Sequence, residues 1–226
     1  MGSARPPKTS KRPSRYSLLS PPVGGTHRPR TDELFSILQS LTDVYSLNVP
    51  VPGRVAALAG DVAAGLSGTR GPRRLADDVW SVQDEHTLVL KRFVDPEEAG
   101  TDTSQTRYHL DARVRDALAG TTPFGARVSR ADYFAEATSG SSPVLYLAVE
   151  SAELERLHGH LVDMFGPLDG VEGPEYVPHV TVARGGSLAT AERVAGPLEP
   201  VEWTVSELLL WSADDGEVAG HIPLPA

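Results

Sequence analysis

The same succession of segments occurs twice along this chain of 226 residues: a short apolar strand, an amphipathic helix, a loop, and a strand that carries a histidine and a threonine. The first copy spans residues 45–51, 55–66 and 86–93, and the second spans 144–150, 154–164 and 179–184. Two matching units predict a two-lobed, pseudo-symmetric domain in which the two histidine strands meet at one cleft. The alternation of elements alone also fits other α/β arrangements.

The remaining segments have weaker patterns. Apolar spacing predicts further helices over residues 104–118 and 188–194, and strands over 125–129 and 201–211, with a last strand ending near 224. Ser151 is a suitable N-cap for the second amphipathic helix. Three aromatic residues, Tyr146, Tyr176 and Trp211, could stack on a base, although packing in the core or at its rim is the commoner role of such side chains.

The second histidine strand lies in residues 176–186 and has a clear alternation. As a strand it places His179 and Thr181 on one face and Val180 and Val182 on the other. The valines can enter a core, which leaves the polar pair facing a cleft. An imidazole exchanges a proton near neutral pH, and a hydroxyl can donate to an anionic oxygen. A lone His-x-Thr is weak evidence for a site, so the recurrence of the pattern in the chain is what favours one.

Charge divides the chain into two parts. Residues 1–43 hold seven Lys or Arg against three Asp or Glu and are rich in Pro, Ser and Gly, which predicts a disordered basic tail or a start-site extension. Residues 31–41 within it have the spacing of a short helix. Residues 44–226 are long enough for one domain and carry 14 basic and 27 acidic residues, a net charge of −13. This acidic, lysine-poor composition is typical of a salt-adapted protein.

Several classes of site are excluded or disfavoured. The absence of cysteine excludes disulfides and Cys-ligated metal sites. No apolar run approaches about 18 residues, so we expect no membrane span and a cytoplasmic location. His158 and His160 point about 200° apart on a helix, so one metal cannot bind both, and we predict that they are surface residues. We expect no metal and no cofactor.

Residues 178–184, Pro-His-Val-Thr-Val-Ala-Arg, resemble the second His-x-Thr motif of the 2H phosphoesterase superfamily, the group of 2′-5′ RNA ligase and cyclic phosphodiesterase-like proteins. The preceding strand, helix and Glu-Gly-Pro-Glu-Tyr segment resemble that family too. The resemblance covers residues 45–226 and is strongest over 143–186. It implies an α+β fold of two lobes, each with an antiparallel sheet and outer helices, and two histidines that face each other across the cleft.

The first motif departs from the family pattern, because the chain has Glu85-His86-Thr87-Leu88 where the family has His-x-Thr. Adjacent residues of a regular strand point to opposite faces. Either His86 enters the cleft with Leu88 in the place of the family's Thr, or Thr87 enters with Glu85 in the place of the family's His. Catalysis by two histidines needs an imidazole here. We therefore predict that His86 faces His179 and that Thr87 reaches the rim by a local twist.

The resemblance implies metal-independent hydrolysis, or the reverse ligation, of 2′,3′-cyclic or 2′-5′ phosphodiesters at RNA ends or in small cyclic nucleotides. We expect a monomer without an obligate protein partner. The rival hypothesis is a non-catalytic module that binds nucleotides or RNA ends, and the altered first motif supports it. The candidate residues are His86 and His179 for acid–base catalysis, and Thr87, Thr181, Arg184 and Lys91 for phosphate binding.

Overall fold

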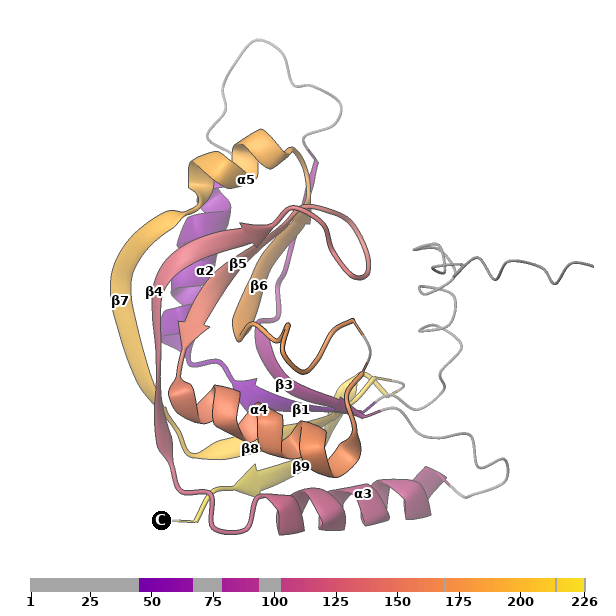
Figure 1. Cartoon of the computed structure of the whole chain (residues 1–226). Helices are drawn as coiled ribbons and strands as arrows, with labels where there is room; N and C mark the ends of the chain where they lie inside the picture. The colour runs from indigo at the N-terminus through magenta and orange to yellow at the C-terminus, as the bar shows by residue number, and fades with distance from the viewer. Residues whose placement is uncertain (1–44, 67–78, 94–102, 169, 214, 226) are drawn as a thin grey trace, which may run out of the picture.

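The computed structural model describes residues 45–66, 79–93, 103–168, 170–213 and 215–225, with side chains omitted for 103–106. The predicted tail and its short helix lie outside the described residues. In the described part, the strands form two antiparallel sheets (Figure 1). The four-stranded sheet has the order β3 (Thr87–Phe93), β1 (Tyr45–Pro50), β8 (Glu207–Ser212), β9 (Glu217–Pro223). The five-stranded sheet has the order β2 (Trp80–Val82), β6 (His179–Gly185), β5 (Val144–Glu150), β4 (Phe124–Phe134), β7 (Gly196–Val205).

Each half of the chain contributes to both lobes. Helix α2 (Gly53–Leu66) follows β1 of the four-stranded sheet but contacts β6 of the other sheet and α5 (Leu188–Val194). Helix α4 (Ala152–Phe165) follows β5 of the five-stranded sheet but contacts β3 and α3 (Thr103–Ala117). Figure 1 shows α2 behind β4 and β5, and α4 in front of the four-stranded sheet. This exchange confirms the predicted pseudo-symmetric α+β fold.

The helices form where the sequence predicts them. Ser151 caps α4, since its side chain accepts a hydrogen bond from the backbone N–H of Leu154. The buried face of α4 consists of Leu154, Leu157, His158 and Leu161. Burial of one such leucine stabilises the fold by about 1.5–3 kcal/mol, so the amphipathic pattern is what fixes the helix on its sheet.

Two strand predictions are wrong in detail. The single strand predicted over residues 201–211 is two strands, β7 and β8, which separate at Ser206 and belong to different sheets. The buried side chains change phase there, from Trp203 and Val205 to Leu208 and Leu210. The segment predicted over residues 125–129 is part of one long strand, β4, which continues past a β-bulge at residues 128–130 to Phe134.

Candidate functional site

Strand β6 carries three polar side chains on one face. His179, Thr181 and Arg184 lie opposite residues of β5 that alternate regularly and therefore share one face. These β5 partners are Ala148, Tyr146 and Val144, in that order. A β-bulge at Val182 inserts one extra residue into β6. Without the bulge Arg184 would point to the opposite side of the sheet from Thr181, so the bulge is what brings the guanidinium to the histidine face.

Strand β3 repeats this arrangement. Thr87, Val89 and Arg92 lie opposite alternating residues of β1, and the bulge falls at Leu90. The β1 partners are Pro50, Asn48 and Ser46, in that order. The two motif strands thus have the same spacing of face residues and the same bulge position.

The correspondence between β3 and β6 assigns every motif position. In this register Thr87 takes the place of His179, Val89 that of Thr181, and Arg92 that of Arg184. We call these six residues the motif face. The position that is symmetric to the histidine of the intact motif is therefore occupied by a threonine.

Arg92 of β3 and Arg184 of β6 lie close enough for their charges to interact. Burial lowers the pKa of Arg92, Glu172 raises it, and the positive charge of Arg184 lowers it further. The pKa of His179 is lowered mainly by burial and also by the charges of Arg184 and Arg92. One imidazole and two guanidiniums, from both motif strands, therefore lie within electrostatic reach of one another. Such a cluster is suited to an anionic ligand.

The imidazole of His179 is held in a defined orientation. Its ring packs edge-on against Phe134 and Tyr146, with ring centroids 5.2 Å and 5.3 Å away. Nδ1 lies 2.7 Å from the carbonyl oxygen of Val177, to which it donates, and this bond opposes the fall in pKa. Near neutral pH the ring is therefore uncharged and Nε2 carries a free lone pair. That is the form a general base requires.

His86 lies outside the strand register that the motif predicts. It precedes β3, and its Nδ1 lies 3.4 Å from the carbonyl oxygen of Thr181, so the half-buried ring reaches β6. Leu88 is fully buried on the core face, which shows that His86 and Leu88 do not enter the site together. Thr87 has the place on the motif face instead. The pairing of His86 with His179 stays a prediction.

Lys91 and Arg92 point to opposite sides of β3. The Lys91 ammonium is buried and donates to Oε2 of Glu172 at 2.6 Å, while the backbone N–H of Arg92 donates to Oε1 of the same carboxylate at 2.6 Å. The structure therefore does not bring Lys91 to the other candidate residues. The bulge at Leu90 reverses the alternation, so the basic side chain on the motif face is Arg92 and not Lys91.

The segment before the second motif is fastened to the bulge of β3. Tyr176 donates its hydroxyl to the carbonyl of Val89 at 3.0 Å, and His158 donates Nδ1–H to the carbonyl of Leu90 at 2.7 Å. His158 also accepts from the N–H of Gly173 and stacks on Tyr176. The prediction that His158 is a surface residue is wrong, because both ring nitrogens are satisfied and the residue is buried. Strand β3 is thus hydrogen-bonded to α4 and to the segment that leads into β6.

Replacement of Lys91 by alanine should lower the free energy of unfolding by about 3–5 kcal/mol, because it leaves the buried carboxylate of Glu172 without its cation. Urea denaturation measures the change. The double variant Lys91→Met, Glu172→Gln removes both charges and should recover most of the loss. A change below about 1 kcal/mol for Lys91→Ala would contradict the structural role of the pair.

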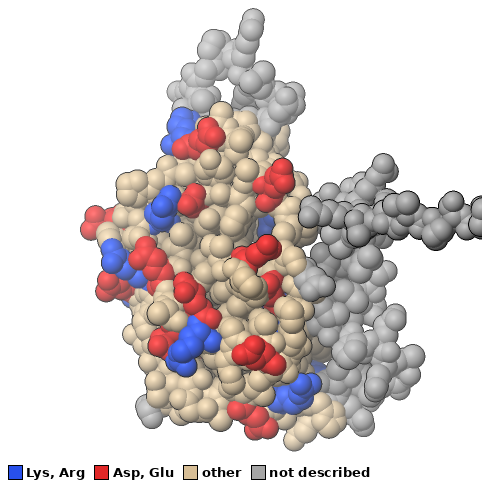
Figure 2. Space-filling view, viewed as in Figure 1, with Lys and Arg blue, Asp and Glu red and all other residues tan. Residues whose placement is uncertain are grey.

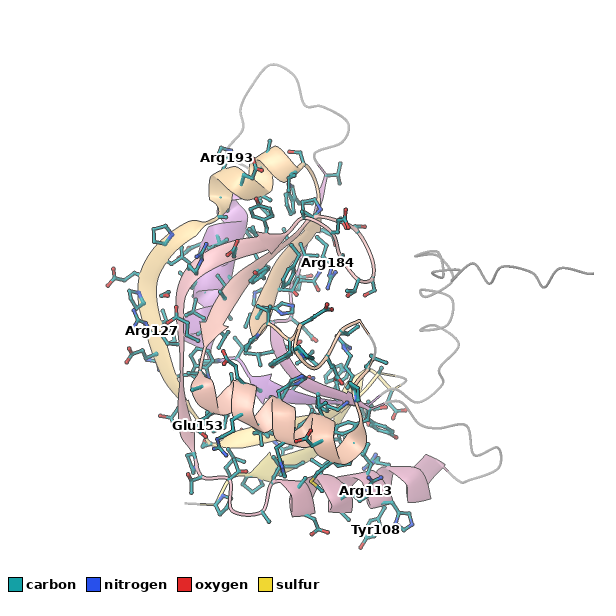
Figure 3. All side chains as sticks on the ribbon, viewed as in Figure 1. Tyr108, Arg113, Arg127, Glu153, Arg184 and Arg193 are labelled. Carbon is teal, nitrogen blue, oxygen red and sulfur yellow. The ribbon has the colours of Figure 1, made fainter. Side chains whose placement is uncertain are left out.

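On the side of the molecule shown in Figure 2, the described residues form no wide basic surface. Figure 2 shows acidic and basic side chains interspersed over the side of the molecule that faces the viewer. Arg184 lies beside the loop that joins β4 and β5, and its Nη1 donates to the carbonyl of Ser139 at 3.0 Å (Figure 3). The hydrogen bond to Ser139 fixes the guanidinium of Arg184 in place. An anion at this position would be held by short contacts, because attraction between distant charges is screened by salt.

Neither a metal cluster nor a membrane span is found in the described ranges. Within them, no three His, Asp or Glu side chains gather in a way that could hold a metal ion. No helix in the described part of the chain has the length and apolar character needed to cross a membrane.

Comparisons with known proteins give a family and a fold. A family model described as the 2′-5′ RNA ligase superfamily matches residues 89–217, more than half of the chain. The crystal structure of TT0787 from Thermus thermophilus has a TM-score of 0.51 at 21% identity, covering 80% of this chain and 97% of that one. E. coli LigT, solved in complex with 3′-AMP, has a TM-score of 0.44 at 16% identity, covering 80% and 94%. No curated protein matches the sequence.

Proposed function

The chain belongs to the 2′-5′ RNA ligase superfamily, and on that premise we propose that it hydrolyses, or in reverse ligates, 2′,3′-cyclic or 2′-5′ phosphodiesters of RNA ends or nucleotides without a metal ion. The observation that carries the proposal is His179 with its free Nε2 beside Arg92 and Arg184. A base promotes the attack of water on a phosphodiester, and nearby cations stabilise the negative charge of the transition state.

In hydrolysis of a cyclic phosphodiester, Nε2 of His179 removes a proton from water as the water oxygen bonds to phosphorus. One P–O bond to the ribose breaks, and the leaving oxygen takes a proton from the imidazolium of His86. Arg92, Arg184 and Thr181 donate to the non-bridging oxygens, where negative charge gathers in the transition state. Ligation uses the same groups with their proton-transfer roles exchanged.

A second candidate function is a module that binds nucleotides or RNA ends without turnover. The observation that favours it is the register of β3, in which Thr87 and Val89 occupy the places of His179 and Thr181. Such a site keeps both arginines but has one imidazole on the motif face.

The test incubates the purified protein with 2′,3′-cyclic nucleotides and a 2′-5′-linked dinucleotide in the presence of EDTA. Turnover that persists with EDTA supports the enzyme. Saturable binding without turnover supports the module. The absence of both binding and turnover would rule out both functions for these ligands.

The pH dependence of kcat/KM should report the shifted pKa of His179. Because burial and the two arginines disfavour the imidazolium, the base form persists to lower pH, so the acid limb should fall below about 6.5. Arg92→Met removes one positive charge and should move that limb to higher pH. Arg127→Met, on an exposed part of β4, should leave it in place. If the acid limb moved to lower pH in Arg92→Met, its assignment to His179 would be contradicted.

A further inference from the structure

The side-chain oxygen of Asn48 lies on the face of the four-stranded sheet that carries Arg92, and it has no hydrogen-bond partner in the described residues. The Oδ1 atom of Asn48 makes no hydrogen bond in the described part of the structure, although the residue is only 5% exposed. A buried amide without a partner destabilises the folded state, and native proteins keep few of them. An exception of this kind needs an explanation, and a group that is paired only in a complex is one.

Asn48 lies next to the motif face. Within the sheet, Arg92, Ser46 and Trp211 are directly opposite one another across β3, β1 and β8, and so share one face. Asn48 occupies the neighbouring row on that face, between Val89 and Leu209. Strands are about 4.8 Å apart, so the backbones of Arg92 and Trp211 are separated by about 10 Å. A nucleotide reaches from its phosphate to its base over a comparable distance.

We propose that this part of the sheet is the binding site for the base of a nucleotide, a proposal that rests on the proposed function for the position of the phosphate. With the phosphate at Arg92 and Arg184, the base lies over β1 and β8. The half-buried indole of Trp211 stacks on the ring. The amide of Asn48 accepts from an N–H on the base edge and can donate to a neighbouring acceptor. Oδ1 is shielded from solvent, so a side chain on this face rotates when the base enters.

The residues that flank the amide fit a base rather than a second phosphate. Val89 and Leu209 are apolar, and the cation in the adjacent row of this face, Arg92, is close enough to His179 to lower the pKa of its imidazole. The ligand class that matches is therefore a nucleotide with an aromatic base, as opposed to a sugar phosphate.

The chain supplies a matched control. Nε1 of Trp203 is the other buried side-chain atom without a partner in the described residues. Trp203 lies on β7, three strands away from β6, beside a pocket of about 430 Å³ lined by Arg54 and Arg127. Trp203→Phe thus removes the other unpartnered buried polar group, which lies in the five-stranded sheet.

Isothermal titration with adenosine 2′-monophosphate and with inorganic phosphate tests the proposal. The wild-type protein should bind the nucleotide at least tenfold more tightly than phosphate, because stacking on an aromatic side chain adds about that much. Asn48→Ala and Trp211→Leu should remove most of this difference and leave phosphate binding unchanged. Trp203→Phe should bind both ligands as the wild type does.

Thermal unfolding separates a binding role from a structural one. Asn48→Ala removes an unpartnered buried group, so its Tm should be unchanged or higher while its nucleotide affinity falls. Equal wild-type affinity for nucleotide and phosphate would overturn the base site and leave the phosphate site standing. Unchanged nucleotide affinity in Asn48→Ala would overturn the part assigned to the amide. Binding of neither ligand would reject the phosphate site and the proposed function with it.

Discussion

Replacement of His179 by alanine is expected to lower kcat on a 2′,3′-cyclic nucleotide at least about a hundredfold, since one general acid or base contributes about 10²- to 10⁴-fold. The imidazole is oriented by Val177, Phe134 and Tyr146, and its Nε2 is free to take a proton. Its lowered pKa keeps it in the base form at neutral pH. No other imidazole lies on the motif face, so no neighbour of the same kind can replace it there.

The fold should survive this change, because the hydrogen bond of the ring is a local one, to the carbonyl of Val177 two residues away. Circular dichroism and Tm measure that. His160→Ala, at an exposed position of α4, is the matched control and should keep full activity. Retention of kcat by a folded His179→Ala protein would remove the acid–base role from this motif.

Arg92→Met is expected to lower kcat/KM about a hundredfold, the usual loss when one donor to the transition-state oxygens is removed. Methionine keeps most of the side-chain volume but carries no charge. The buried pair of Lys91 and Glu172 beneath it stays intact, since Glu172 is bonded to the backbone N–H of Arg92 and not to its guanidinium. The loss should therefore occur without a fall in Tm.

Substitutions at the adjacent residues Lys91 and Arg92 should thus affect different properties of the protein. Lys91→Ala should lower stability, whereas Arg92→Met should lower activity. Arg127→Met serves as the control for loss of an arginine elsewhere on the protein and should change neither. The opposite result would be an Arg92→Met protein as active as the wild type and an inactive Lys91→Met, Glu172→Gln protein. That result would show that the faces assigned to Lys91 and Arg92 are wrong.

The sequence predicts the fold well because the fold depends on patterns that single residues do not disturb. The duplicated strand and helix segments, the Ser151 cap and the apolar face of α4 are all confirmed. In the second motif, His179 and Thr181 precede the bulge of β6, so regular alternation places them correctly. Their shared face follows from the sequence without knowledge of the bulge.

The first motif could not be predicted in the same way. The bulges at Leu90 and Val182 each insert one residue, which reverses every face assignment that follows. Strict alternation from Thr87 would place Lys91 on the motif face, whereas the bulge at Leu90 places Arg92 there. Alignment of the segments 87–92 and 179–184 by their final arginines would have shown that Thr87 stands in the place of His179. The burial of His158 depends on a loop whose course the sequence pattern does not determine.

The central claim is that β3 and β6 present equivalent positions to one phosphate, and exchange of two adjacent residues tests it. His86→Thr alone should lower kcat/KM about a hundredfold if His86 supplies the second imidazole. Adding Thr87→His moves the imidazole to the position equivalent to His179. We predict that the double variant regains at least tenfold of the lost kcat/KM, measured with a 2′,3′-cyclic nucleotide and EDTA. A double variant no more active than His86→Thr would contradict the equivalence of the two strands.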